Sequence, residues 1–373
     1  MAPHTESDIN ANHIPKYTQS VVRSNKPVQR STYHLFGIEW VIPWRVTRAR
    51  ALQALSALHY SFMWLIAPMF CVYVPIYLVL YSNLRWLVFL YLGWLYYDRH
   101  RARLGSRVTE SVKDWAFWRH LRDYFPIRLV KTAELDPNRN YIFGYHPHGI
   151  SAVGAFTNFA TNATNFKQIF PGLKSHLLTL VGMFFFPLRR DYCMLADVHE
   201  CSAAAIRYLF SAKDKGHALL IVIGGAAEAM FAQPGQHRLV ALKRKGFVKM
   251  AIKYGADLVP VYSFGENELY RQLQPADNSL MQRFQYWTKK HLGIPLIVFH
   301  GRGLLNHTWG IVPFRRPITT VVGSAIRVDQ CDHPTSAQIN AVHQQYIDGL
   351  IELFESEKHK YDVPEHVHLE FVA

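Results

Sequence analysis

The chain has 373 residues, of which 50% are hydrophobic, 14% aromatic and 18% charged. That composition supports a sizeable folded core and excludes an intrinsically disordered chain. The formal net charge of +14 predicts an anionic partner: a nucleic acid, an anionic membrane surface or a phosphorylated substrate.

Residues 1–50 are polar and contain no apolar run of the kind that forms a signal peptide. We therefore expect a polar cytosolic segment over 1–50. The cysteines have neither CxxC nor metal-ligand spacing, which predicts reduced thiols in or facing the cytosol. They are Cys71, Cys193, Cys201 and Cys331.

A membrane-embedded helical hairpin is predicted over 51–97. No Asp, Glu, Lys or Arg occurs from Ala51 to Leu84, and a second apolar run, WLVFLYLGWLYY, follows Arg85. That second run covers only about 18 Å as a helix, against a hydrocarbon core of about 30 Å. Two full spans and a wedge in one leaflet therefore both stay open, and a buried hairpin in a soluble protein is the alternative.

Both flanks of this hairpin are basic, which predicts that both lie on the cytosolic side. The arginines are Arg45, Arg48 and Arg50 before it, and Arg99, Arg101, Arg103 and Arg107 after it. They account for part of the positive charge. Zinc-finger spacing, RNA-binding strand motifs and base-reading basic helices are all lacking, so we expect no nucleic-acid partner.

Residues 98–373 predict one cytosolic α/β domain with a mixed sheet flanked by helices. Short apolar runs predict buried strands at 140–146, 217–225, 257–265 and 318–323. Candidate helices lie between and after them, at 150–165, 199–212, 242–254, 277–292 and 334–358.

Three loops that follow predicted strands combine glycine with a titratable side chain. They are YHPHGI (145–150), GGAAEA (224–229) and FGENE (264–268). Glycine lets a ligand approach the backbone closely, and a histidine beside a glutamate can take a proton from a hydroxyl. Polar residues at strand ends of such sheets are typical of active sites.

Other interpretations of these loops carry less weight. His146 and His148 could bind zinc, but no third ligand stands at a motif spacing, so no metal is expected. Either histidine could instead be satisfied in the core. As a dinucleotide fingerprint GGAAEA is weak, because it lacks the third glycine and the spacing.

A basic segment, LKRKGFVKMAIKYG, leads into a predicted helix that begins near Gly246. Lysines at a helix N-terminus attract phosphate, although a solvated charged face is the simpler alternative. The basic residues of the segment are Lys243, Arg244, Lys245 and Lys249, and Arg302, Arg315 and Arg316 follow later in the chain. They predict a phosphate-bearing substrate and a second one reached through the membrane.

Five blocks resemble the signature motifs of the type-2 diacylglycerol acyltransferase family, which includes the monoacylglycerol and wax-alcohol acyltransferases. They are YIFGYHPHGI, VIGGAAEA, RKGFVKMAIKYGADLVPVYSFGENE, FHGRG and PITTVVG. The resemblance covers about residues 33–373, and the long block from Arg244 to Glu268 is highly specific.

This resemblance implies an acyltransferase-like domain that transfers acyl groups from acyl-CoA to the hydroxyl of an acylglycerol. It places His146 and His148 in the catalytic block, with Glu228 as the carboxylate partner. We expect His148 to be the general base, Glu228 to hold its tautomer, and no acyl-enzyme to form. Acyl-CoA is a co-substrate and no cofactor is expected. Its expected binding residues are Gly149, Gly224, Gly225, Arg244, Lys245, Lys249, Glu266 and Arg302.

Two departures from the pattern matter. Broader glycerolipid acyltransferases carry an Asp five positions after the His, whereas Ser151 and Val153 stand there in this chain. The carboxylate must therefore come from elsewhere, and Glu228 is the inference. Many relatives also carry a Gly-Gly pair and later a Ser-Arg where this chain has LADVHECSAAA (195–205).

The sequence thus predicts a diacylglycerol acyltransferase of the endoplasmic reticulum membrane, with lipid droplets as a further location. Monoacylglycerol or a fatty alcohol stays open as the acceptor, since HLEF (368–371) and AVGAF (152–156) resemble the monoacylglycerol branch. A homo-oligomer is also left open. The competing hypotheses from other classes are a non-catalytic lipid-droplet scaffold and a metal-dependent hydrolase.

Overall fold

A seven-stranded sheet forms the centre of the computed structural model, which describes residues 31–35, 38–42, 47–104, 110–293, 295–303 and 309–372. The strands lie in the order β3 (Ile127–Lys131), β12 (Ile318–Val322), β9 (Asp257–Phe264), β4 (Tyr141–His146), β7 (His217–Val222), β5 (Lys174–Thr179) and β6 (Val198–Glu200). Only the β12–β9 pair is antiparallel, so the predicted mixed sheet is confirmed.

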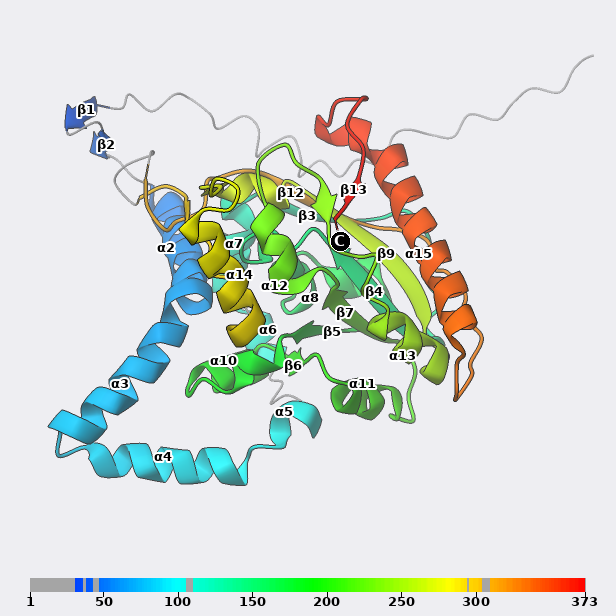
Figure 1. Cartoon of the computed structure of the whole chain (residues 1–373), viewed down its shortest axis with the longest axis horizontal. Coiled ribbons are helices and arrows are strands. Elements are labelled where there is room, and N and C mark those ends of the chain that lie inside the picture. Colours follow the sequence, from blue (N-terminus) through cyan, green and yellow to red (C-terminus); the bar gives the residue numbers. More distant parts are fainter. Residues whose placement is uncertain are drawn as a thin grey trace, which may run out of the picture.

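Helices cover both faces of this sheet (Figure 1). One face packs against α7 (Ala116–Tyr124) and α8 (Val153–Phe159), and the other against α11 (Ala203–Phe210), α13 (Gly246–Tyr254) and α15 (Ser336–Glu357). All six residues of the central strand β4 are therefore buried. Burial from both sides explains why its sequence is a nearly continuous apolar run.

The four predicted strands are confirmed, but the sequence missed the three other strands of the central sheet. Strand β3 alternates buried and exposed residues, and β5 begins with the polar residues Lys174, Ser175 and His176. Strand β6 has only three residues at the sheet edge. These segments lack the continuous apolar run that marks a strand buried on both faces.

Two predicted helices have the wrong extent. The helix expected at 150–165 is only α8, which ends at Phe159. The helix expected at 199–212 starts late, because Val198–Glu200 pair with β5. The Ser202 hydroxyl then accepts a hydrogen bond from the Ala205 N–H and begins α11. The helices α13, α14 (Leu280–Leu292) and α15 lie where they were expected.

A continuous helix of 34 residues precedes the domain. It comprises α2 (Arg48–Ser61), the π-helical turn η1 (Phe62–Ile66) and α3 (Ala67–Tyr81), and it is long and apolar enough to cross a membrane. Pro68 lies at the start of α3, where its missing N–H interrupts the helical ladder beside η1. A turn at 82–84 leads into α4 (Arg85–Tyr97), and the embedding of the predicted hairpin in a membrane stays a prediction.

The start of this long helix belongs to the folded domain. Ala57 and Tyr60 are buried, and α2 packs along α7. The Tyr60 hydroxyl also donates a hydrogen bond to the Ser151 carbonyl at 2.7 Å. The domain boundary that the sequence placed at residue 51 therefore falls within a helix that the domain holds.

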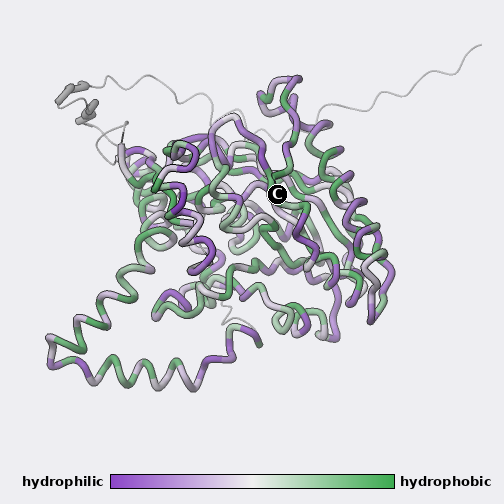
Figure 2. Tube along the Cα trace, viewed as in Figure 1, coloured by the Kyte–Doolittle hydropathy of each residue, from purple (hydrophilic) through white to green (hydrophobic). Residues whose placement is uncertain are grey.

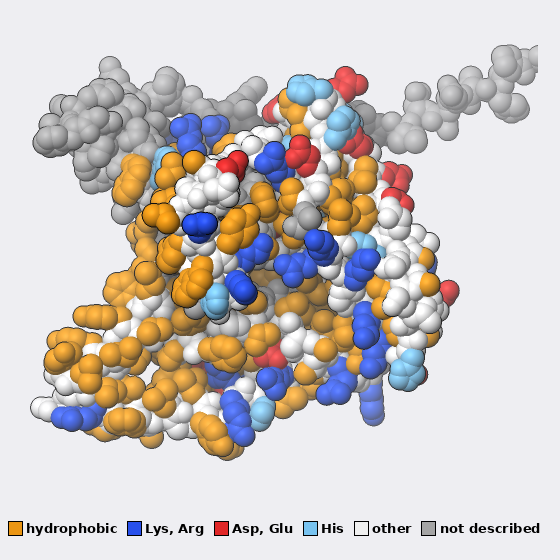
Figure 3. All heavy atoms as spheres, viewed as in Figure 1, with side chains coloured by type: hydrophobic (Ala, Val, Ile, Leu, Met, Phe, Trp, Pro, Cys, Tyr) orange, Lys and Arg blue, Asp and Glu red, His pale blue; other side chains and the backbone are white. Residues whose placement is uncertain are grey.

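Helices α3 and α4 project from the domain and carry an apolar surface (Figure 2). Hydrophobic side chains cover both of them in the space-filling view (Figure 3). Their largest exposed hydrophobic residues include Met69, Tyr73, Ile76, Leu80, Tyr81, Trp86, Phe89, Leu90 and Tyr97. Within the part of the chain that the structure describes, these side chains form no core.

Short elements complete the described chain. The helical ones are α5 (Arg101–Leu104), α6 (Glu110–Lys113), α9 (Phe166–Ile169), η2 (Val181–Phe184), α10 (Arg189–Leu195), α12 (Gly225–Glu228), η3 (Ala229–Phe231), η4 (Glu266–Leu269) and η5 (Lys358–Tyr361). The pairs of short strands are β1 (Ser31–Leu35) with β2 (Ile38–Ile42), β8 (Arg238–Leu239) with β13 (Glu370–Phe371), and β10 (Arg271–Gln272) with β11 (Phe299–His300).

Candidate active site

The three strand-end loops meet at the carboxyl-terminal end of the central strands. Strands β4, β7 and β9 are neighbours and run parallel, so their carboxyl ends lie together. Glu228, after β7, accepts a hydrogen bond at 2.7 Å from the backbone N–H of His148, after β4. Glu266, after β9, accepts one at 2.7 Å from the N–H of Val153. The structure therefore brings the three loops together.

Glu228 is the carboxylate at the centre of these loops. It is 2% exposed, and its second oxygen accepts a hydrogen bond from the Val240 N–H at 2.8 Å. Burial raises the pKa of this carboxyl, but His146 and the two backbone N–H groups outweigh burial and bring the pKa below its ordinary value. Glu228 is therefore ionised at neutral pH.

His146 is completely buried behind the loop. The Tyr346 hydroxyl donates to the Gly144 carbonyl at 3.0 Å, so it accepts from Nε2 of His146 at 3.1 Å. The other ring nitrogen, Nδ1, lies 3.8 Å from Oε2 of Glu228, beyond hydrogen-bonding distance. His146 thus forms part of the support of the site and has no surface open to a substrate.

His148 is half-buried, and its ring orientation suits a general base. Nδ1 lies 3.0 Å from the Gly149 carbonyl oxygen, which can only accept, so Nδ1 carries the proton and Nε2 has the lone pair. Burial lowers the pKa of His148 more than the Gly149 carbonyl and Glu228 raise it. The imidazole is therefore neutral near pH 7.

One detail of the sequence interpretation is wrong. Glu228 was expected to orient the His148 imidazole, but it binds the backbone N–H of His148. The Gly149 carbonyl holds the ring instead. Glu228 consequently fixes the loop that carries the base, and faces the ring of His146.

Glu266 binds the backbone that follows the His148 loop. It is 1% exposed, and its carboxylate accepts hydrogen bonds from the N–H groups of Val153 and Gly154 and from the Tyr145 hydroxyl. A side chain at Gly149, where φ is +60°, would place its Cβ 2.9 Å from Cγ of Glu266. Glu266 and Gly149 thus pack against each other, and their expected contact with acyl-CoA stays a prediction.

Replacing Glu266 with Gln is expected to remove a pH dependence of stability. Burial raises the pKa of Glu266 to about 7. This group therefore stabilises the wild-type fold fully below about pH 4.5, and roughly 3 kcal/mol of that unfolding free energy is lost as the pH rises from there to about 7. Thermal unfolding at several pH values should show that loss in wild type and in the control Glu268→Gln, but not in Glu266→Gln. Parallel curves for all three proteins would contradict the assignment.

The two glycines of GGAAEA differ in role. A Cβ at Gly224 would lie 2.1 Å from Oε2 of Glu228, so this glycine lets the backbone approach the carboxylate. Gly225 has φ of +54° and faces open space. Of the two, Gly225 has the geometry expected where a ligand approaches the backbone.

The predicted basic segment surrounds the start of α13. Arg244, Lys245 and Lys249 are exposed, and Lys245 donates a hydrogen bond to Asn340 at 2.7 Å. Helix α13 ends just before β9 begins, so its N-terminus faces the edge where β4 and β7 end. Lys and Arg side chains gather over this helix in Figure 3.

Arg302 lies in a different environment. Its guanidinium is 5.9 Å from the ring centroid of Tyr124, and its backbone pairs with Val312. Arg315 lies over the same ring at 5.5 Å, and burial followed by Arg50 and Arg302 lowers the pKa of Arg315. These contacts place Arg302 near the start of α2, and none of them joins it to the strand-end loops.

The sequence missed Tyr346 and Tyr145. Tyr346 comes from α15, about two hundred residues after His146, and its hydroxyl occupies the space beside Gly144. Tyr145 was quoted within the motif, but its hydrogen bond to Glu266 at 3.0 Å was not foreseen. A buried tyrosine in a helix has no local signal for such a contact.

Within the described part of the chain, the two motif histidines belong to no group of three residues with metal-ligand spacing. Among the described residues, the group with metal-ligand spacing consists of His176, Asp197 and His199, which lie on and beside strands β5 and β6. That the motif histidines hold no metal stays a prediction.

Comparison with known proteins gives clear similarities. A model of the Diacylglycerol acyltransferase family matches residues 77–372. Diacylglycerol O-acyltransferase 2 of Homo sapiens is 43% identical over 333 residues, which is 89% of this chain and 85% of the human protein. 2-Acylglycerol O-acyltransferase 1 of Bos taurus is also 43% identical, over 88% of this chain and 98% of its own length.

Among solved structures, the 1-acyl-sn-glycerophosphate acyltransferase PlsC of Thermotoga maritima matches with a TM-score of 0.35 and 10% identity. The match covers 81% of this chain and 96% of that chain. A TM-score this low does not establish a shared fold, so nothing is inferred from this match.

Proposed function

Because this chain belongs to the diacylglycerol acyltransferase family, we propose that its strand-end loops transfer an acyl group from acyl-CoA to the free hydroxyl of diacylglycerol. The chain is a membrane-associated acyl-CoA-dependent acyltransferase, and triacylglycerol is the product of this acceptor. The observation that carries the proposal is the ring of His148, whose Nε2 has a free lone pair. The ring lies where the carboxylates of Glu228 and Glu266 and the Gly149 turn come together.

The reaction needs one base and no protein nucleophile. Nε2 of His148 takes the proton from the acceptor hydroxyl while that oxygen attacks the thioester carbonyl carbon. The C–S bond then breaks, and the CoA sulfur leaves with the proton that His148 returns. Glu228 and His146 position the loop during both proton transfers. Because the acceptor oxygen attacks the thioester directly and CoA leaves as the free thiol, no covalent acyl-enzyme forms.

The basic segment at α13 is proposed to bind the phosphates of acyl-CoA. Phe247, in the first turn of α13, packs edge-to-face on Tyr346 with ring centroids 4.9 Å apart, and Tyr346 contacts His146. The helix N-terminus and the exposed side chains of Arg244 and Lys249 are thus connected to the site by two contacts. Positive charge and free N–H groups at a helix start favour phosphate.

Replacing Arg244 and Lys249 together with Gln is expected to raise KM for acyl-CoA roughly tenfold with little change in kcat, because only ground-state charge attraction is lost. Steady-state kinetics in detergent or membranes measures both constants. The matched control is Lys289→Gln with Lys290→Gln on α14. An unchanged KM would remove this segment from the acyl-CoA site.

A second acceptor, monoacylglycerol, has support of its own. The bovine 2-acylglycerol O-acyltransferase 1 is as similar as the human diacylglycerol enzyme, and the match covers 98% of its length. Membranes that contain this chain should be given labelled acyl-CoA with diacylglycerol, monoacylglycerol or a fatty alcohol in parallel. Fastest esterification of diacylglycerol supports the first proposal, and fastest esterification of monoacylglycerol replaces it. No esterification of any acceptor would favour the lipid-droplet scaffold.

We further propose that α3 and α4 are embedded in the endoplasmic reticulum membrane, with the α/β domain in the cytosol. The two helices expose large apolar side chains, and α4 has only 13 residues, about 20 Å. That length is short of a hydrocarbon core of about 30 Å. A wedge that enters one leaflet therefore suits these helices better than two complete spans.

Charge placed on this surface should release the protein from membranes. Leu80→Lys with Leu90→Lys puts two cations among exposed apolar side chains, each at a cost of up to about 3 kcal/mol inside a bilayer. Flotation with liposomes should show loss of the double variant from the lipid fraction. Ile351→Lys, on α15, is the matched control and should float like wild type. Equal flotation of all three proteins would argue against embedding through α3 and α4.

A further inference from the structure

A second group of titratable side chains lies at the far end of the sheet from the strand-end loops. Asp197 and His199 come from the segment LADVHECSAAA (195–205), and His176 comes from the neighbouring strand β5. Strands β7 and β5 separate β6 from β4, so this cluster is distinct from the site of acyl transfer.

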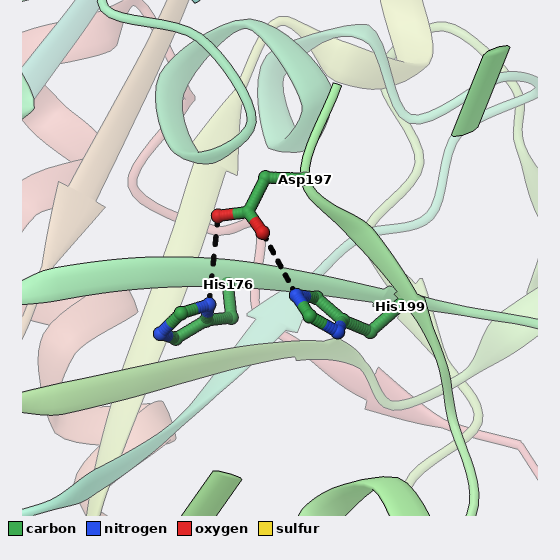
Figure 4. Close-up of side chains that lie close together, drawn as sticks. All are labelled: His176, Asp197 and His199. Atoms are coloured by element: carbon green, nitrogen blue, oxygen red, sulfur yellow. Dashed lines mark hydrogen bonds and ion pairs between the residues drawn. The ribbon is translucent and has the colours of Figure 1, made fainter. Parts of the chain in front are cut away.

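The three side chains point toward one another (Figure 4). Oδ1 of Asp197 lies 2.8 Å from Nε2 of His199, and Oδ2 lies 3.5 Å from Nδ1 of His176. Their ligand atoms all lie within 4.8 Å of one another. Ligands on a tetrahedral zinc ion, with bonds of about 2.0–2.1 Å, stand about 3.3 Å apart. The 2.8 Å spacing from Oδ1 to His199 is shorter than that value, and the 3.5 Å spacing to His176 is measured from Oδ2, the other oxygen of the same carboxylate.

The side chains are shielded from solvent, and their hydrogen bonding is incomplete. The exposed fractions are 3% for Asp197, 3% for His199 and 14% for His176. Nδ1 of His176 is buried and has no hydrogen-bond partner in the described chain. A buried ring nitrogen that faces a carboxylate without bonding it is available as a ligand.

Groups behind His176 fix its ring as a metal ligand requires. Nε2 of His176 lies 3.0 Å from Nδ1 of His217, and Nε2 of His217 lies 3.3 Å from Oδ1 of Asp214. If each Nε2 donates along this chain toward the carboxylate, Nδ1 of His176 is left with its lone pair directed at the cluster. Metal-binding histidines commonly donate their other N–H to such a partner.

We propose that His176, Asp197 and His199 form a site for a divalent transition-metal cation, with zinc as the ion that two imidazoles and one carboxylate suit well. Nδ1 of His176, Nε2 of His199 and Oδ1 of Asp197 supply three ligands, and the fourth position takes water. Lys113 donates to Oδ2 of Asp197 at 2.6 Å and remains as a support of the carboxylate. This proposal does not depend on the acyltransferase reaction.

The proposed metal site lies next to the residues that attach the apolar helices to the domain. Asp197 follows α10, whose Arg190 forms an ion pair at 2.7 Å with Asp98 at the end of α4. The guanidinium of Arg189 lies 4.4 Å from the ring of Trp64 in η1. A bound ion would therefore tie the segment that holds the base of α3 and α4 to the edge of the sheet.

The test uses the full chain purified in detergent, freed of metal with a chelator, and titrated with Zn²⁺ against a competing indicator. Wild type is expected to bind one Zn²⁺ per chain, and the melting temperature should rise with Zn²⁺ concentration. His199→Asn and His176→Asn should each weaken binding at least about 100-fold, and His217→Phe roughly 10–100-fold, since it removes only the orienting partner. His291→Asn, on exposed α14, should bind like wild type.

Folding of the variants is checked by their melting temperature without metal. Lys113→Met keeps all three ligands and removes the cation beside the carboxylate, so it should bind Zn²⁺ at least as tightly as wild type. Co²⁺ should give visible d–d absorption bands in wild type and not in His199→Asn. The proposal is overturned if wild type binds no Zn²⁺ beyond what His199→Asn binds, which would leave the cluster as a hydrogen-bonded network of histidines.

Discussion

His148→Ala is expected to lower kcat for acyl transfer by roughly 10²–10⁴-fold, the usual contribution of a general base. The variant removes the ring whose Nε2 takes the hydroxyl proton. The half-buried ring has one hydrogen bond, to the Gly149 carbonyl, so stability should change little. Labelled acyl-CoA assays on membranes, with expression matched by immunoblot, measure the loss. His291→Ala, an exposed histidine on α14, is the control.

The pH profile separates a base from a merely structural histidine. Burial lowers the pKa of His148 below its ordinary value of about 6.5, and only the neutral imidazole accepts a proton. The wild-type kcat/KM should therefore be level from about pH 7 upward and fall only at more acidic pH. The residual activity of His148→Ala should lack that acidic limb. A variant that keeps a third of wild-type activity would remove His148 from the base role.

The second large effect is expected for Glu228→Gln. The carboxylate accepts two backbone N–H groups, and an amide can accept only one of them because its NH₂ would face the other donor. One buried N–H left unpaired costs about 1–3 kcal/mol of unfolding free energy. The displaced loop should also lower kcat by about 10–100-fold, since the base is carried on the His148 backbone.

Chemical denaturation and the acyl-CoA assay measure these two losses. The control Glu365→Gln changes an exposed carboxylate near the C-terminus and should alter neither quantity. A Glu228→Gln protein with wild-type stability and activity would show that the two backbone hydrogen bonds do not hold the site. A variant that is less stable yet fully active would show that Glu228 stabilises the fold and does not position the catalytic base.

The strands that carry the site could be predicted because they are buried on both faces. Burial on both faces makes β4, β7 and β9 into apolar runs, and the polar residues that end those runs stand out. Strands β5 and β6 were missed because β5 begins with polar residues and β6, although buried, has only three residues. The cluster of His176, Asp197 and His199 was therefore invisible, because its members belong to strands that the pattern did not reveal.

The sequence by itself determined the family, the α/β class, the apolar helices and the three loops that follow the central strands. Each of these depends on local composition or on a contiguous motif. Only the tertiary structure decided which atoms meet. Glu228 binds the backbone N–H of His148, the Gly149 carbonyl binds the His148 ring, and the Tyr346 hydroxyl binds the His146 ring. Such contacts join residues from one to two hundred positions apart, and they depend on strand order and side-chain direction, which a one-dimensional pattern does not encode.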